Sequence, residues 1–291
     1  MERTVTIGAG AAAPTGNGHR VTRLARQSLA ALVLFLVVGC SSGGNTPVGA
    51  LVPAGTSLSG WWWIELGVAF GTDPAEYITI PVNALHQGSN FSFCAEMGVV
   101  SGSTITFADP EAIVPALTMV NSDRLEGMGT ETDPMIGTIT TTVVMTRPAP
   151  APSGTLTATG MLDGQPVAVS STAATGVYEV VDPDDCNPPC PAGSASIQAV
   201  DCSDPSNLYS IEIRVLSGPP MLGNVYTIGP DAEFDFDTAS SDAFAMSGTF
   251  TLTRADAAVG GRMMGTYDVV LDTGESISGA FDVEVADLVQ P

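Results

Sequence analysis

The chain has 291 residues and a formal net charge of −22 at pH 7, because its 31 acidic residues face nine arginines and no lysine. A strongly acidic surface repels nucleic acid and anionic lipid headgroups, so a DNA- or RNA-binding role is excluded. With 32 Gly, 21 Pro and 14% charged residues, the composition is typical of a turn-rich β protein and not of a disordered chain.

The N-terminal residues have the pattern of an export signal. Residues 29–38 are all apolar or small, and Arg20, Arg23 and Arg26 precede them. This is the charge order of a secretory signal peptide, and the apolar run is too short to span a bilayer. We therefore predict a signal peptide over residues 1–39 and an exported protein.

The apolar run closes with Val37-Val38-Gly39-Cys40, which resembles the lipobox of bacterial lipoproteins. The resemblance implies that the Cys40 thiol receives a diacylglycerol, that cleavage occurs before Cys40, and that the freed amine is acylated, for example with palmitate. Ser41 in place of Asp implies delivery to the outer membrane, by analogy with Gram-negative lipoproteins. The alternative is a buried helix with an incidental Cys, for which no downstream segment offers a partner. Acylated Cys40 is thus the expected link to the lipid membrane.

The mature chain is predicted to contain a tether and two β domains. Residues 40–59 are rich in Gly, Ser and Pro and carry no charge, as in a flexible tether. The first domain spans residues 60–148, a stiff Pro/Ala linker spans 149–153, and the second domain spans 154–288. After cleavage the chain keeps 30 acidic residues and five arginines, a formal net charge of −25.

Alternating apolar residues predict strands throughout the first domain. They start with Trp62, Ile64, Leu66 and Val68 on one face of a strand. Further strands are predicted at 78–82, 91–97 and 104–107, and the last at 137–147, with Ile139, Thr141, Val143, Met145 and Arg147 on one face. Six or seven strands in about 90 residues indicate a small, closed or nearly closed antiparallel barrel.

Both ends of this domain resemble lipocalin-like barrels. Gly60-Trp61-Trp62 is similar to their opening Gly-x-Trp, and Thr146-Arg147 is similar to their late strand Arg. The resemblance implies that Arg147 lies across Trp62 and closes the barrel floor. It also allows a small apolar cavity, for which Ile64, Leu66, Phe93 and Val143 are the expected lining. The alternative is a core Trp with Arg147 in solvent.

The second domain is also predicted to be all-β, as a sandwich or a barrel. It opens with a hairpin whose turn is Asp163-Gly164, and a strand begins at 178–181. Strands at 195–200, 209–216 and 224–228 follow, and then a three-stranded meander whose inward residues are Met246, Phe250, Leu252, Met263, Tyr267, Val269, Leu271, Ile277, Phe281, Val283 and Val285.

This stretch is similar to a group of secreted bacterial β domains of unknown function. The similarity is carried by LTATGMLDGQPV, GNVYTI, SGTFTLT, GTYDVVL and ISGAFDVEV. Because that group has no assigned activity, the resemblance implies a fold and nothing more.

The sequence offers little for catalysis. The mature chain contains one His, His86, and no nucleophile elbow, phosphate-binding loop or His-Glu-x-x-His motif. Any two of the carboxylates could form a glycosidase-like pair, and the sequence names none. We therefore predict no enzyme, no catalytic residue and no cofactor.

Four cysteines follow Cys40, namely Cys94, Cys186, Cys190 and Cys202. Export and an even number favour two disulfides, with three connectivities open. Cys94 belongs to the first domain, so either it links the two domains or it stays free. A zinc or redox site at Cys186 and Cys190 is the alternative, although no His is near and the spacing is not Cys-x-x-Cys.

Carboxylates recur at every second residue in Asp231, Glu233, Asp235 and Asp237, with Phe between them. The segment fails as an EF-hand loop, so no metal ligand is predicted. We interpret it as a solvated strand face that discourages edge pairing. Weak divalent cation binding is expected only if the acidic loop at 182–185 folds against this strand.

Two function hypotheses follow. The first is a non-catalytic lipoprotein of the bacterial envelope with a binding or structural role and an unidentified partner or ligand. The second is a lipocalin-like carrier of a small apolar ligand.

Overall fold

The computed structural model describes residues 57–71, 75–107, 114–133, 137–181, 190–239 and 241–289. These residues form strands and turns and no helix, which confirms the all-β class. Within these ranges no helix is long and apolar enough to cross a membrane. The predicted signal peptide, Cys40 and residues 41–56 of the tether lie outside the described residues.

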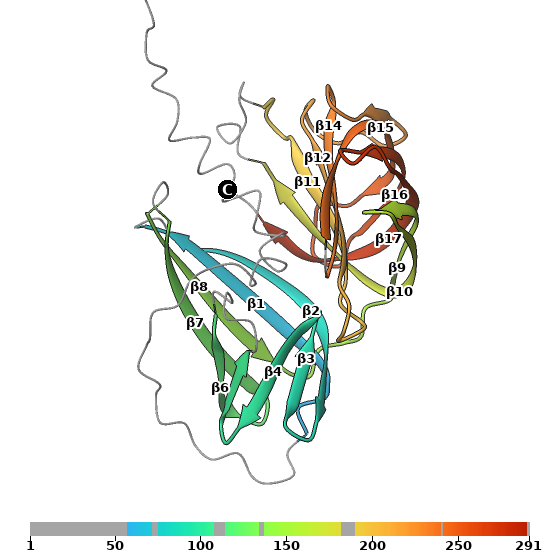
Figure 1. The fold of residues 1–291 in the computed structure, drawn as a ribbon. Helices are drawn as coiled ribbons and strands as arrows, with labels where there is room; N and C mark the ends of the chain where they lie inside the picture. The colour runs from blue at the N-terminus through green and yellow to red at the C-terminus, as the bar shows by residue number, and fades with distance from the viewer. Residues whose placement is uncertain are drawn as a thin grey trace, which may run out of the picture.

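The first eight strands form a closed antiparallel barrel in which each strand pairs with the next and β8 returns to β1 (Figure 1). The strands are β1 (Gly60–Phe70), β2 (Glu76–Gln87), β3 (Asn90–Phe93), β4 (Glu96–Ser101), β5 (Thr104–Phe107), β6 (Ala116–Asn121), β7 (Arg124–Asp133) and β8 (Gly137–Thr146).

Strand alternation builds the core of this barrel. Leu66 of β1 lies opposite Ile78 of β2 on one side and Val143 of β8 on the other. Residues opposite each other in an antiparallel pair point to the same face, so all three side chains enter the interior. Trp62, Ile64 and the others predicted on this face of β1 are buried with them.

Two features of the first barrel differ from the sequence prediction. The single strand predicted over 91–97 is wrong, because Cys94 and Ala95 adopt positive φ angles of 43° and 70° and form the turn between β3 and β4. Strands β6 and β7 were not predicted. In β7 the inward position after Leu125 is Gly127, which has no side chain, so the apolar alternation that marks a strand is interrupted there. A Cβ at Gly127 would lie only 2.6 Å from Leu117 Cδ2.

The second half forms a barrel, not a sandwich. Its pairings run β9, β10, β11, β12, β14, β15, β16, β17 and back to β9, and β13 pairs with β15 outside this ring. The strands are β9 (Gly154–Leu162), β10 (Gln165–Val180), β11 (Ala195–Asp201), β12 (Tyr209–Val215), β13 (Val225–Thr227), β14 (Ala232–Thr238), β15 (Ser241–Ala255), β16 (Arg262–Leu271) and β17 (Ser276–Val289).

The pairings of this second barrel are antiparallel except for one between β10 and β17, which is parallel. The Asp163-Gly164 turn joins β9 to β10 as predicted, with positive φ at both residues. The strand expected to begin at 178 is instead the end of β10, a single strand of 16 residues.

The meander residues predicted to face inward are buried, with one exception. Met246 is 62% exposed, whereas Phe250 and Leu252 on the same strand are fully buried. The register of β15 against β16 shifts between Ala245 and Ser247, and this bulge turns Met246 to the outer face.

Candidate functional site

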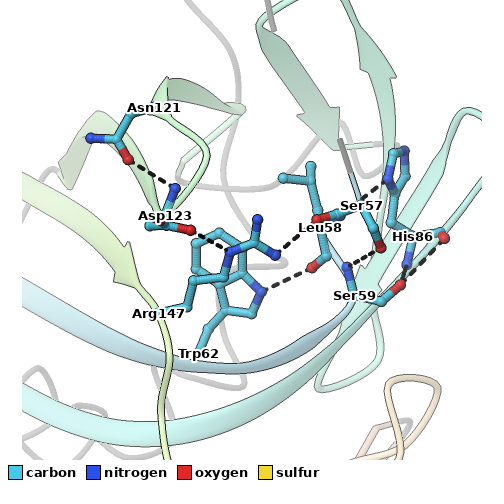
Figure 2. Close-up of polar contacts among 8 residues, drawn as sticks. All are labelled: Ser57, Leu58, Ser59, Trp62, His86, Asn121, Asp123 and Arg147. Atoms are coloured by element: carbon cyan, nitrogen blue, oxygen red, sulfur yellow. Dashed lines mark hydrogen bonds and ion pairs between the residues drawn. The ribbon is translucent and has the colours of Figure 1, made fainter. Parts of the chain in front are cut away.

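The structure brings the predicted pair Trp62 and Arg147 together at one end of the first barrel. The guanidinium carbon of Arg147 lies 4.7 Å from the centre of the Trp62 ring, a cation–π distance. The ring is fully buried, and its Nε1–H donates to the carbonyl oxygen of Leu58 at 2.9 Å (Figure 2).

The segment just before β1 completes this end of the barrel, which we call the floor (Ser57, Leu58, Trp62, Asp123 and Arg147). Leu58 is fully buried. Arg147 donates from Nη1 to the Ser57 carbonyl at 2.8 Å and from Nε to Asp123 Oδ1 at 3.0 Å (Figure 2). Arg147 thus links the segment before β1 to the β6–β7 turn, and its guanidinium group lies over the Trp62 ring.

His86 lies beside the floor and is hydrogen-bonded to the segment before β1. Its Nδ1 accepts from the Leu58 N–H at 3.4 Å, while Ser59 Oγ contacts the backbone N–H and carbonyl of His86 (Figure 2). The His86 Nε2 is buried without a hydrogen-bond partner. A hydroxyl nucleophile needs its hydrogen bond to the imidazole, and this serine uses its hydroxyl on the backbone.

The residues expected to line a ligand cavity belong to the packed interior. Ile64, Leu66, Phe93 and Val143 are each at most 2% exposed and lie in one cluster with Trp62. Other large inward side chains of this cluster are Phe70, Phe91, Met119 and Met145. An eight-stranded barrel has an interior that side chains of this size can fill.

A disulfide joins the two barrels. Cys94, in the β3–β4 turn, is bonded to Cys202, which directly follows β11 and lies 108 residues further along the chain. Of the two alternatives left open by the sequence, Cys94 therefore takes the one that links the domains. Cys190 is disulfide-bonded as well, and Cys186 lies outside the described residues.

Backbone and apolar contacts surround this disulfide. Val177, Val200 and Leu208 of the second barrel join the hydrophobic cluster of the first. Among the described residues, four hydrogen bonds link the two barrels at this contact, which we call the joint. They run from Asn83 N–H to the Cys202 carbonyl at 3.0 Å, from Asn83 Nδ2 to the Ser203 carbonyl at 2.9 Å, from Ala95 N–H to the Pro205 carbonyl at 3.0 Å, and from Thr79 N–H to Asp287 Oδ2 at 2.6 Å. The two barrels therefore pack as one body.

The acidic strand is β14, and its surroundings contradict the solvated-edge interpretation. It pairs with β12 on one side and β15 on the other, so it is not an edge strand. Phe234 and Phe236 enter the core as predicted, but Asp237 on the outer face is only 6% exposed. Because adjacent strands add polar side chains to this outer face, its carboxylates are crowded and not freely solvated.

Asp235 and Asp237 each lie opposite one other carboxylate. Glu212 of β12 lies opposite Asp235, and Asp242 of β15 lies opposite Asp237. Burial, and then the negative charge of Glu212, raises the pKa of Asp235 to about 7, with Arg214 acting in the opposite direction. Burial, followed by the charges of Asp235, Glu212 and Asp242, raises the pKa of Asp237 to about 8.

The raised pKa of Asp237 predicts a pH-dependent stability. The unfolded chain ionises this group from about pH 4 upward, whereas the folded chain keeps it protonated to about pH 8, so rising pH removes stability within that window. We expect Asp237→Asn to be more stable than wild type by about 2–4 kcal/mol at pH 8.5 and to match it at pH 4. Thermal melts across this range measure the difference, with exposed Asp268→Asn as the control; equal pH profiles for wild type and Asp237→Asn would contradict the prediction.

In the part of the chain that the structure describes, no group of three or more His, Cys, Asp or Glu side chains could hold a metal ion. The residues at 182–185, on which the weak cation site depended, lie outside it.

Comparison with known proteins yields no relative by sequence: no family model matches the chain, and no curated protein matches it. Among solved structures, intact Ap-TbpB with N and C lobes aligns at 8% identity over 84% of this chain and 81% of that one, with a TM-score of 0.18. A double mutant of the vaccine antigen Transferrin Binding Protein B from Haemophilus parasuis Hp5 aligns at 9% identity over 83% and 78%, with a TM-score of 0.15. Similarities at this level transfer no function.

Proposed function

We propose that the protein is an exported lipoprotein, held at the outer membrane through acylated Cys40, that acts by binding or as envelope structure and not by catalysis. The observation that carries the proposal is the Cys94–Cys202 disulfide. Such bonds form and persist in oxidising compartments outside the cytosol, so it supports the export that the leader sequence predicts.

The floor of the first barrel suggests how the body is attached. The described chain begins at Ser57, which Arg147 holds at the floor. A Gly/Ser/Pro-rich segment such as residues 40–56 would have a mean end-to-end distance of roughly 20–25 Å if it behaved as a flexible chain. The floor would then be the end of the molecule nearest the membrane.

One further observation supports a non-catalytic role, and another weighs against a ligand carrier. The hydroxyl of Ser59 is bonded to backbone atoms of His86 and not to its imidazole. The residues that would line a carrier cavity in the first barrel are packed against other core side chains. The outer surfaces of the two barrels are therefore the candidates for binding.

The proposal is tested by Cys40→Ala in the full chain expressed in a Gram-negative host. We expect complete loss of label from an alkyne analogue of palmitate, and transfer of the protein from the membrane to the soluble fraction, because one thiol carries the whole anchor. Ser101→Ala, at an exposed position of the first barrel, is the control and should keep both label and membrane association. Equal labelling of wild type and Cys40→Ala would end the lipoprotein hypothesis.

A further inference from the structure

The outer face of β12, β14 and β15 combines carboxylates that range from buried (Glu212 and Asp237) to exposed (Asp242) with exposed apolar side chains. We call it the acidic face and define it by Ser210, Glu212, Asp235, Asp237, Asp242, Phe244 and Met246. We propose that the acidic face docks a basic segment of a partner protein whose arginines or lysines alternate with apolar side chains. The inference rests on the proposed binding role and on removal of residues 1–39 with their four arginines, and not on the lipid anchor.

Charge complementarity carries the first step. In the pairs Glu212–Asp235 and Asp237–Asp242, like charges lie directly opposite each other, which destabilises a sheet. Arg214 is the nearby cation, and its two hydrogen-bonded ion pairs are with Glu212 and Glu233.

The other four arginines of the mature chain form ion pairs elsewhere. Arg124 pairs with Glu126, Arg147 with Asp123, Arg254 with Asp256 and Arg262 with Asp282. Since the sequence contains no lysine, the mature chain holds no uncommitted basic side chain for Asp235, Asp237 and Asp242. A cation that balances these carboxylates once they ionise, above about pH 7 to 8, would therefore come from another molecule.

A buried hydroxyl provides an independent indication of a missing ligand. Ser210 is 1% exposed, and its Oγ has no hydrogen-bond partner. It lies opposite Asp237 in the β12–β14 register, so its side chain points to the same face as the carboxylates. A buried polar group without a partner is costly, and an ammonium or guanidinium group could donate to both Ser210 and Asp237.

The exposed apolar side chains at the margin of the acidic face favour a protein segment over a metal ion as the ligand. Phe244 lies opposite Asp235 and is 51% exposed, and Met246 follows it on the outer face of β15. An aromatic ring beside a carboxylate suits the alkyl stem and charged head of Arg or Lys, and exposed Met suits an apolar neighbour in the same segment. A bare cation would use neither side chain.

The test is fluorescence anisotropy at 150 mM NaCl and pH 8.5, where Asp235 and Asp237 are ionised, with a labelled ten-residue peptide of alternating Arg and Leu. The full mature chain is used in phosphatidylcholine nanodiscs, with empty nanodiscs as the blank. If the chain proves to carry no lipid anchor, it is used in buffer. Failure of the anchor hypothesis therefore does not decide whether the acidic face binds the peptide. We expect Asp235→Asn/Asp237→Asn to weaken binding at least tenfold and Phe244→Ser to weaken it several-fold. The matched control Asp268→Asn/Glu284→Gln removes two carboxylates from exposed positions of the same barrel and should change affinity by less than twofold.

Binding should also strengthen between pH 6 and pH 8.5. Asp235 and Asp237 must ionise to receive the peptide, whereas exposed carboxylates are ionised throughout this range. The charged groups that set their titration are Glu212 and Arg214 from β12, Glu233 from β14 and Asp242 from β15. Equal losses in the acidic-face variant and the control, or affinity independent of pH, would reduce the interaction to general charge attraction and overturn the proposal. Competition by 5 mM Ca²⁺ beyond that of NaCl at equal ionic strength would replace it with a metal site.

Discussion

The double variant Cys94→Ser/Cys202→Ser is expected to lose about 4–5 kcal/mol of unfolding free energy. The disulfide spans 108 residues, and a cross-link that closes a loop of this size removes that much conformational freedom from the unfolded chain in the entropy model. The total free energy of unfolding of a typical domain is only about 5–15 kcal/mol. The melting temperature should therefore fall by roughly 10–15 °C.

Differential scanning calorimetry of the full chain measures this loss. Replacing both cysteines leaves no new thiol, so reshuffling does not confuse the result. Ser101→Ala, at an exposed position in the first barrel, is a suitable control and should leave the transition unchanged. A loss below about 1 kcal/mol would mean that the apolar contacts and hydrogen bonds of the joint hold the barrels together without the disulfide.

Trp62→Ala should cost about 3–5 kcal/mol, the usual range for removing a fully buried Trp. The substitution empties the space that the ring fills, removes the cation–π partner of Arg147 and leaves the Leu58 carbonyl without its Nε1–H donor. Trp62→Phe keeps most of the apolar volume, so its smaller cost, about 1–3 kcal/mol, isolates the lost hydrogen bond and ring size.

Urea unfolding followed by circular dichroism is the appropriate measurement, because fluorescence would change with the number of tryptophans. Trp63→Ala is the matched control, since Trp63 is only half-buried on the opposite face of the same strand, and a loss below about 2 kcal/mol is expected. If Trp62→Ala and Trp63→Ala cost the same, the floor is not the stabilising feature that its contacts indicate.

The sequence predicted best those strands whose inward positions all carry apolar side chains. In β1 each such position is apolar from Trp62 to Phe70, and the pattern identified the core face correctly. In β7 the inward Gly127 carries no side chain, and its space is filled by Leu117 and Val114 from elsewhere in the barrel. No local pattern could reveal that strand. The turn at Cys94-Ala95 was missed for a similar reason, because it contains neither Gly nor Asn.

The candidate sites show the same limit. The alternation along β14 placed Phe234 and Phe236 inward and the carboxylates outward, as observed. Its neighbours Glu212 and Asp242 come from strands that the sequence does not pair with it, so neither the crowding nor the burial of Asp237 could be anticipated. The approach of Arg147 to Trp62 was expected only from a family resemblance, whereas the role of Ser57 and Asp123 in holding Arg147 had no sequence signal.

Closure of the second barrel has a consequence for how the chain reaches its native state. The strand pairing that closes the second barrel joins β9 to β17. There Thr157 and Ala280, which are 123 residues apart in the sequence, exchange hydrogen bonds. Until β17 arrives, β9 and β16 each present an open backbone edge, and Thr79 of the first barrel lacks its Asp287 acceptor. Pairings this distant in sequence make folding slow, and open edges invite other chains. Until β17 is in place, the chain therefore exposes strand edges to which other polypeptides can pair.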